Sequence, residues 1–156
     1  MKHIDRTRLV NYFAYGSNMN PERMRERGVL FYSRQRLILP GYGLIFNKTV
    51  STPNAGAANI VPDKNAVVEG VLYQVTLKGI LNLDKYEHYP NEYDRVILRV
   101  PYKVNQHLEI KTYIAQQDKT RDQLKPTRLY LDHLLAADDL LSENYYNELK
   151  MLETLD

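Results

Sequence analysis

The stretch Tyr12-Phe13-Ala14-Tyr15-Gly16-Ser17-Asn18-Met19 carries an apolar segment directly into a Gly-Ser-Asn loop. Residues 9–15 are typical of a buried strand, and the helix that follows has Asn20 as its predicted N-cap and Pro21 in its first position. Strand, loop and helix start together place several backbone N–H groups around one small space, which suits a carboxylate or a polarised carbonyl oxygen. Gly16 allows a positive φ and lets a ligand approach the backbone closely. Spacing alone, however, favours a strand-to-helix turn that binds nothing.

The composition is that of a globular protein of one domain. The chain has 156 residues, of which 44% are hydrophobic and 26% are charged. No apolar run is long enough to cross a bilayer, and the basic residues 1–8 are followed by no apolar signal core, which predicts neither a membrane partner nor secretion. The absence of cysteine excludes disulfides, thiolate metal sites and a cysteine nucleophile, and it fits a cytoplasmic location. The net charge of +2 is too small to indicate a nucleic-acid partner.

Hydrophobic periodicity predicts an α+β fold, because strands dominate the middle of the chain without strict βαβ alternation. Tyrosine supplies much of the aromatic surface, with 13 Tyr against 3 Phe and no Trp. The predicted helices are 20–27 (ending at Gly28), 77–85 (capped by Thr76), 127–140 and 142–155 (capped by Ser142). The predicted strands are 9–15, one or two within 29–39, 44–46, 57–61, 67–75, 95–104 and 107–115, with a turn at 40–43, loops at 47–56 and 116–126, and a strand end at Pro62-Asp63.

A second informative stretch, residues 83–93, follows the predicted central helix and contains three carboxylates, one histidine and three tyrosines. Glu87 comes just after the helix should end, where the helix dipole disfavours negative charge. Such a conflict sometimes marks a functional position, although a surface glutamate is the simpler interpretation. His88 is interpreted as an ordinary surface or half-buried histidine, and Glu92 is the rival carboxylate.

The spacing of the histidines and of Ser17 indicates neither a metal site nor a serine nucleophile. The four histidines show no metal-ligand pattern of the HExxH type, and Ser17 does not lie in a G-x-S-x-G elbow. We interpret the basic cluster of Arg23, Arg25 and Arg27 as a solvated helix face with local ion pairs.

Taken in order, three motifs resemble the γ-glutamylcyclotransferase family. They are Tyr12–Met19, the strand ending in Gly70-Val71-Leu72-Tyr73, and Leu83-Asp84-x-x-Glu87. A fourth segment, Pro126-Thr-Arg-Leu-Tyr130, resembles the one that brings a substrate-facing tyrosine to the site in that family. The resemblance extends from about Tyr12 to the last predicted helix.

The resemblance implies one domain over residues 1–156, built as a small mixed β-barrel with surrounding helices. It implies a reaction in which the α-amine of a γ-glutamyl group attacks its own γ-carbonyl, releasing 5-oxoproline and a free amine, with no cofactor and no metal. It makes Glu87 the general acid/base and Tyr130 a substrate-binding tyrosine. It also implies a substrate-binding loop that comprises Tyr12, Phe13, Ala14, Tyr15, Gly16, Ser17 and Asn18.

One carboxylate placed between the attacking and leaving amines can move both protons, and burial should raise its pKa toward a useful value. His88 stands where the family often has glycine, which puts the substrate choice in doubt. A non-catalytic domain that binds carboxylates or γ-glutamyl compounds on the same fold remains the alternative. An interaction module that uses the tyrosines is disfavoured by the near-neutral charge. The leaving amine and the oligomeric state stay undetermined.

Overall fold

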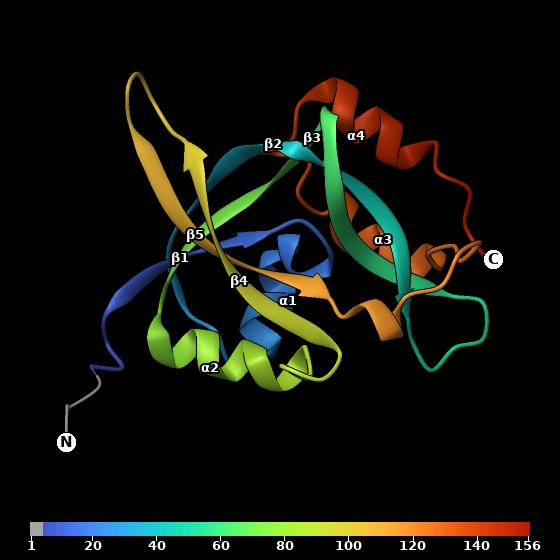
Figure 1. Ribbon diagram of the computed structural model, residues 1–156, viewed down its shortest axis with the longest axis horizontal. Coiled ribbons are helices and arrows are strands. Elements are labelled where there is room, and N and C mark those ends of the chain that lie inside the picture. The colour runs from blue at the N-terminus through green and yellow to red at the C-terminus, as the bar shows by residue number, and fades with distance from the viewer. Residues whose placement is uncertain (1–4) are drawn as a thin grey trace.

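The computed structural model describes residues 5–156, and in them five strands form one mixed sheet that four α-helices accompany (Figure 1). The strand order is β2–β3–β1–β5–β4, with β1 parallel to β5 and the other neighbours antiparallel. The predicted α+β class and mixed sheet are therefore confirmed, although no ladder joins β2 to β4 in the described residues. The strands are β1 (Leu9–Ala14), β2 (Phe31–Thr49), β3 (Gly56–Thr76), β4 (Tyr93–Pro101) and β5 (His107–Ala115). The helices are α1 (Pro21–Glu26), α2 (Leu77–Tyr86), α3 (Arg128–Leu135) and α4 (Glu143–Lys150), with 3₁₀ turns η1 (Ser17–Met19) and η2 (Gln117–Lys119).

The long antiparallel pair β2–β3 replaces the separate short strands predicted over residues 29–75. At Pro40-Gly41 the register shifts and Gly41 has a φ of 83°, so a bulge bends β2 where a turn was expected. The predicted strand end at Pro62 is also wrong. β1 covers only Val71–Thr76 of β3, so Pro62 lies where β3 pairs with β2 alone and its missing N–H breaks no second ladder. Figure 1 shows this pair arching from α2 toward α3 and α4.

The helices begin at the predicted caps. The side chains of Asn20, Thr76 and Ser142 accept hydrogen bonds from backbone N–H groups in the first turns of α1, α2 and α4. Gly28 has a φ of 72° just beyond α1, as expected for a helix end. α3 and α4 are shorter than predicted, ending at Leu135 and Lys150.

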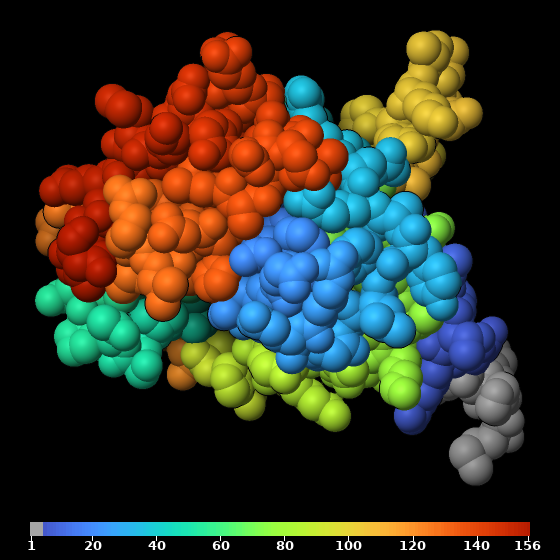
Figure 2. All heavy atoms as spheres, turned by 180° about the vertical axis from the view of Figure 1, so that it is seen from behind, coloured from blue at the N-terminus to red at the C-terminus, as the bar shows by residue number. Residues whose placement is uncertain are grey.

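Two apolar clusters occupy the two sides of the sheet. Tyr12 and Ala14 of β1 belong to the cluster that packs against the helices, whereas Phe13 belongs to the other, as the alternation of a strand requires. Figure 2 shows the α1 region beside α3, and Asn20 Nδ2 lies 3.1 Å from His133 Nδ1 across this contact. No helix within residues 5–156 is long and apolar enough to cross a membrane.

Candidate active site

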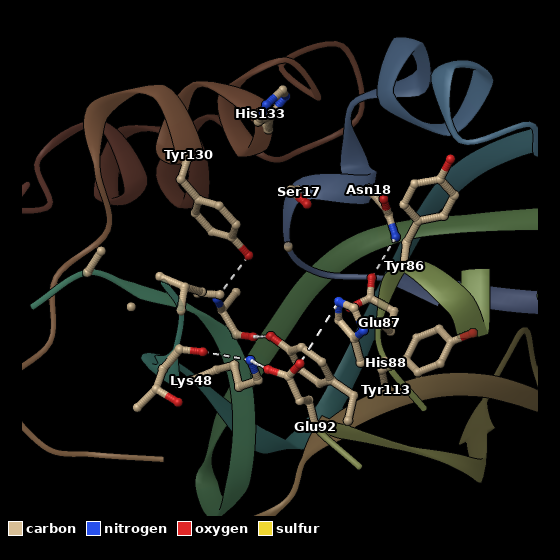
Figure 3. Close-up of a pocket in the computed structure, with 18 of the residues that line it drawn as sticks. Ser17, Asn18, Lys48, Tyr86, Glu87, His88, Glu92, Tyr113, Tyr130 and His133 are labelled. Carbon is tan, nitrogen blue, oxygen red and sulfur yellow. Dashed lines mark hydrogen bonds and ion pairs between the residues drawn. The ribbon is translucent and has the colours of Figure 1, made fainter. Parts of the chain in front are cut away.

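A cavity of about 840 Å³ lies where the loop after β1, the end of α2 and the start of α3 meet the β2–β3 pair. Figure 3 shows Ser17 and Asn18 on one side of this space, Tyr130 and His133 reaching in from α3, and Lys48 with Glu92 opposite. Segments between residues 12 and 133 therefore contribute to one partly open cavity.

Glu87 is the best-buried carboxylate of this cavity. It is the C-cap of α2, and its side chain is only 15% exposed. Its Oε1 accepts hydrogen bonds from Asn18 Nδ2 at 3.2 Å and from Arg27 Nη1 at 3.3 Å. Burial raises the pKa of Glu87, and the nearby Arg27 charge opposes the rise without cancelling it. Glu87 is thus a stronger base than an ordinary glutamate.

The loop after β1 presents backbone donors to the same space. Ser17–Met19 form a 3₁₀ turn in which Met19 N–H donates to Gly16 O at 3.0 Å. The N–H groups of Gly16 and Asn18 donate no hydrogen bond to any part of residues 5–156, whereas the N–H of Ser17 faces the Tyr130 hydroxyl and lowers its pKa. The N–H groups of Gly16 and Asn18 are therefore available to a ligand oxygen.

Gly16 does not adopt the positive φ that glycine allows, because its φ is −113°. Crowding explains the glycine instead. A Cβ on Gly16 would lie 3.1 Å from both Ala58 Cβ and Tyr130 Oη, so any side chain would push into the cavity wall.

Tyr130 reaches the site from the first turn of α3. Its hydroxyl accepts a hydrogen bond from Ala58 N–H at 2.9 Å, and Tyr93 Oη donates to Ala58 O at 2.7 Å. The two tyrosines thereby provide hydrogen-bond partners for the backbone N–H and C=O of Ala58, a part of β3 with which β1 does not pair. Since the Tyr130 oxygen accepts from the backbone, its own proton is free to donate to a ligand. Burial raises the pKa of Tyr130 to about 12, so that proton is retained at neutral pH.

The arginines of α1 correct the interpretation of a solvated helix face. Arg27 Nη1 donates to Asn18 Oδ1 at 3.0 Å, and its side chain is 13% exposed. Arg23 Nε donates to Ser17 Oγ at 3.0 Å. Only Arg25 lies on the surface, where it pairs with Glu22. Arg23 and Arg27 share a helix face through their i, i+4 spacing, and this signal could have placed them beside the loop.

Lys48 is a site residue that the sequence did not indicate, because it falls in a predicted loop. It is buried at the end of β2, and its Nζ donates to Glu92 Oε1 at 2.8 Å and to Thr49 O at 2.6 Å. The hydrogen bond from Lys48 lowers the pKa of Glu92, whereas the pKa of Glu87 is raised.

His88 lies beside the same carboxylate, with its Nε2 4.0 Å from Glu92 Oε2. The φ of His88 is 53°, a backbone angle that glycine adopts without strain.

Most residues of the predicted site line the cavity, but two do not. Phe13 and Ala14 are buried in the two apolar clusters and contribute packing only. Among residues 5–156, no three His, Asp or Glu side chains come together as metal ligands would. The predicted residues that do line it are Tyr12, Tyr15, Gly16, Ser17, Asn18, Glu87 and Tyr130.

Fold and site define a small α+β domain whose buried carboxylate shares a cavity with a loop of unengaged amide groups. The model of the family described as "Gamma-glutamyl cyclotransferase, AIG2-like" matches residues 12–132, and the chain belongs to this family.

Individual relatives agree with this assignment. A γ-glutamylcyclotransferase of Bos taurus is 36% identical over 80 residues, which are 49% of this chain and 43% of the bovine protein. The alignment thus spans less than half of that curated relative. A solved structure titled "Gamma-glutamyl cyclotransferase" superposes with a TM-score of 0.80 at 24% identity, covering 96% of this chain and 90% of that chain. YkqA from Bacillus subtilis gives a TM-score of 0.80 at 25% identity, covering 94% of this chain and 56% of YkqA. At these identities, the structural likeness establishes the fold.

Proposed function

We propose that this protein is a γ-glutamylcyclotransferase, which cyclises a γ-glutamyl group to 5-oxoproline and releases the amine bound to it. The observation that carries the proposal is the position of Glu87. This buried carboxylate, with its raised pKa, shares one cavity with the N–H groups of Gly16 and Asn18, which donate to no acceptor within residues 5–156.

The proposed chemistry needs one proton shuttle and one oxyanion site. Glu87 accepts a proton from the substrate α-ammonium, and the freed amine attacks the γ-carbonyl carbon of the same molecule. The loop N–H groups stabilise the negative oxygen of the tetrahedral intermediate. Glu87 then gives its proton to the leaving nitrogen as the C–N bond breaks. The ring nitrogen loses its second proton by the same route, so the leaving amine gains both protons and departs as an ammonium. Because both reacting groups belong to one substrate, the cavity mainly selects the folded-back conformer, and such orientation contributes several kcal/mol.

The alternative, a domain that binds γ-glutamyl compounds without reaction, fits Glu87 less well. Burial raises the pKa of Glu87 and so disfavours the ionised form that would hold the substrate ammonium, which suits a group that exchanges protons better than one that only binds. Glu92 is a weaker candidate for that task, because Lys48 holds it ionised and hydrogen-bonded.

A substrate screen tests the proposal. The protein is incubated with γ-glutamyl dipeptides, ε-(γ-glutamyl)-lysine and glutathione, and 5-oxoproline is measured by mass spectrometry. We expect release from at least one of them, and we expect Glu87→Gln to lower kcat by about 10²- to 10⁴-fold while the fold is retained. Glu92→Gln makes the same chemical change at the rival carboxylate and should lower kcat only slightly. Glu26→Gln, at an exposed position, serves as the surface control.

The outcomes separate the candidates. A protein that binds 5-oxoproline but releases none from any of these compounds is a binding domain. If Glu92→Gln is inactive and Glu87→Gln is not, the acid/base has been assigned to the wrong carboxylate.

A further inference from the structure

Only some of the positively charged side chains in the cavity are paired with a carboxylate. Four arginine and lysine side chains line it, of which Arg27 is paired with Glu87 and Lys48 with Glu92. The other two, Arg23 and Lys119, form no ion pair with any carboxylate of residues 5–156.

Of these two cations, Arg23 is the one held next to Glu87. Its Nε is fixed at 3.0 Å from the neutral Ser17 Oγ, which leaves its two terminal nitrogens without an acceptor in the described chain. Burial lowers the pKa of Arg23, and the charge of Arg27, one helical turn away, lowers it further. Two guanidinium charges thus act on one carboxylate, with which only Arg27 is paired, so an additional anion would be stabilised here.

We infer that Arg23 binds the α-carboxylate of the substrate and thereby makes a free α-carboxylate a requirement of this site. The inference rests on the proposed function. In a γ-glutamyl compound, the α-amine and the α-carboxylate are attached to the same carbon. If the amine lies at Glu87, the carboxylate must lie within a few bond lengths of it, and Arg23 is the unpaired cation of the same cavity whose charge acts on Glu87. The planar fork of arginine matches a carboxylate with two parallel hydrogen bonds.

Arg27 and Lys48 are less suited to this role. Arg27 already donates to Asn18 Oδ1 and Glu87 Oε1, and Lys48 to Glu92 Oε1 and Thr49 O. Taking the substrate carboxylate would require either side chain to give up bonds that it makes in the free protein.

Binding of two matched ligands tests the inference without requiring turnover. 5-Oxoproline keeps the α-carboxylate, and its α-carboxamide differs only in that group. Affinities are measured by calorimetry for the unchanged protein, Arg23→Met, Arg23→Lys and the control Arg25→Met, which removes an exposed arginine from the same helix. We expect the unchanged protein and Arg25→Met to bind 5-oxoproline roughly ten- to a hundredfold more tightly than the amide. We expect Arg23→Met to lose most of this preference, with the affinity for the amide unchanged.

The inference is overturned if Arg23→Met keeps the full preference, or if it weakens both ligands equally, which would reveal a role in loop structure only. It is also overturned if the unchanged protein does not prefer the carboxylate. Should Arg23→Met fail to fold, Arg23→Lys decides, because an undiminished preference would rule out the two-bond contact. An Arg23-dependent preference in a protein that releases no 5-oxoproline from γ-glutamyl compounds supports this inference and refutes the proposed function. Release of 5-oxoproline by a protein that shows no Arg23-dependent preference supports the proposed function and overturns this inference.

Discussion

Replacement of Tyr130 by phenylalanine would remove one oxygen that has two tasks. The hydroxyl accepts the hydrogen bond of Ala58 N–H at 2.9 Å, and it keeps its own proton for a ligand in the cavity. Phenylalanine keeps the ring and its packing, which includes an edge contact with Phe46 at 6.3 Å between ring centroids. The variant therefore tests the hydroxyl alone.

The expected loss of stability follows from the backbone group left behind. Ala58 is 2% exposed, so its N–H would lose its acceptor at a buried position in the cavity wall. An unsatisfied buried donor costs about 1–3 kcal/mol, and for a chain of this size each kcal/mol lowers Tm by about 2–4 °C. We expect Tm to fall by about 2–12 °C. The lost bond to a charged substrate group should raise KM roughly ten- to a hundredfold, with a smaller effect on kcat.

Tyr145→Phe provides the matched control for thermal unfolding. The Tyr145 hydroxyl is also buried, but it has no hydrogen-bond partner in residues 5–156. Removing it deletes an oxygen without orphaning a donor, so Tm should stay constant or rise slightly. Differential scanning calorimetry of both variants, together with steady-state kinetics on the best γ-glutamyl substrate, completes the test.

The reasoning fails if Tyr130→Phe unfolds at the same temperature as Tyr145→Phe, since Ala58 N–H would then not depend on the hydroxyl. A collapse of kcat at constant KM would mean that Tyr130 acts in the transition state and belongs with the catalytic residues. If neither constant changes, Tyr130 is a wall of the cavity and nothing more.

Three further perturbations test other parts of the site. Gly16→Val should weaken 5-oxoproline binding at least about tenfold in a calorimetric titration, because its side chain would enter the crowded wall of the cavity, and unchanged affinity would make the loop only a turn. The acidic limb of the pH profile of kcat/KM should reflect the raised pKa of Glu87. Arg27→Met should move that limb to higher pH, because it removes a positive charge that favours the ionised Glu87 carboxylate. A shift of the limb to lower pH would contradict the assignment of Glu87. Lys48→Met should raise the pKa of the Glu92 carboxyl in a carbon-detected NMR titration, since the hydrogen bond that lowers it is lost, and a constant pKa would show that the pair is not formed in solution.

Local features of the fold were predictable because they depend on neighbouring residues. The caps at Asn20, Thr76 and Ser142 and the helix end at Gly28 are confirmed, since each requires only a side chain or a backbone angle within one turn. The strands predicted at 95–104 and 107–115 are confirmed as β4 and β5, which are neighbours along the chain and pair with each other.

The predictions that failed depend on distant partners. Pro62 looked like a strand end, but its effect depends on whether a second strand pairs with it, and β1 stops short of that point. Lys48 looked like a loop residue, although it is buried against Glu92, which lies 44 positions further along the chain.

The sequence by itself determined the order of the motifs, the family that they resemble and the residue types available for chemistry, because these are properties of the chain read in order. Only the tertiary structure decided how those residues are used. It buried Glu87 between Asn18 and Arg27 and so raised its pKa, turned Arg23 inward beside the loop, and placed the Tyr130 hydroxyl on the uncovered edge of β3. The physical reason is that burial, charge balance and hydrogen-bond satisfaction depend on which distant segments meet in space.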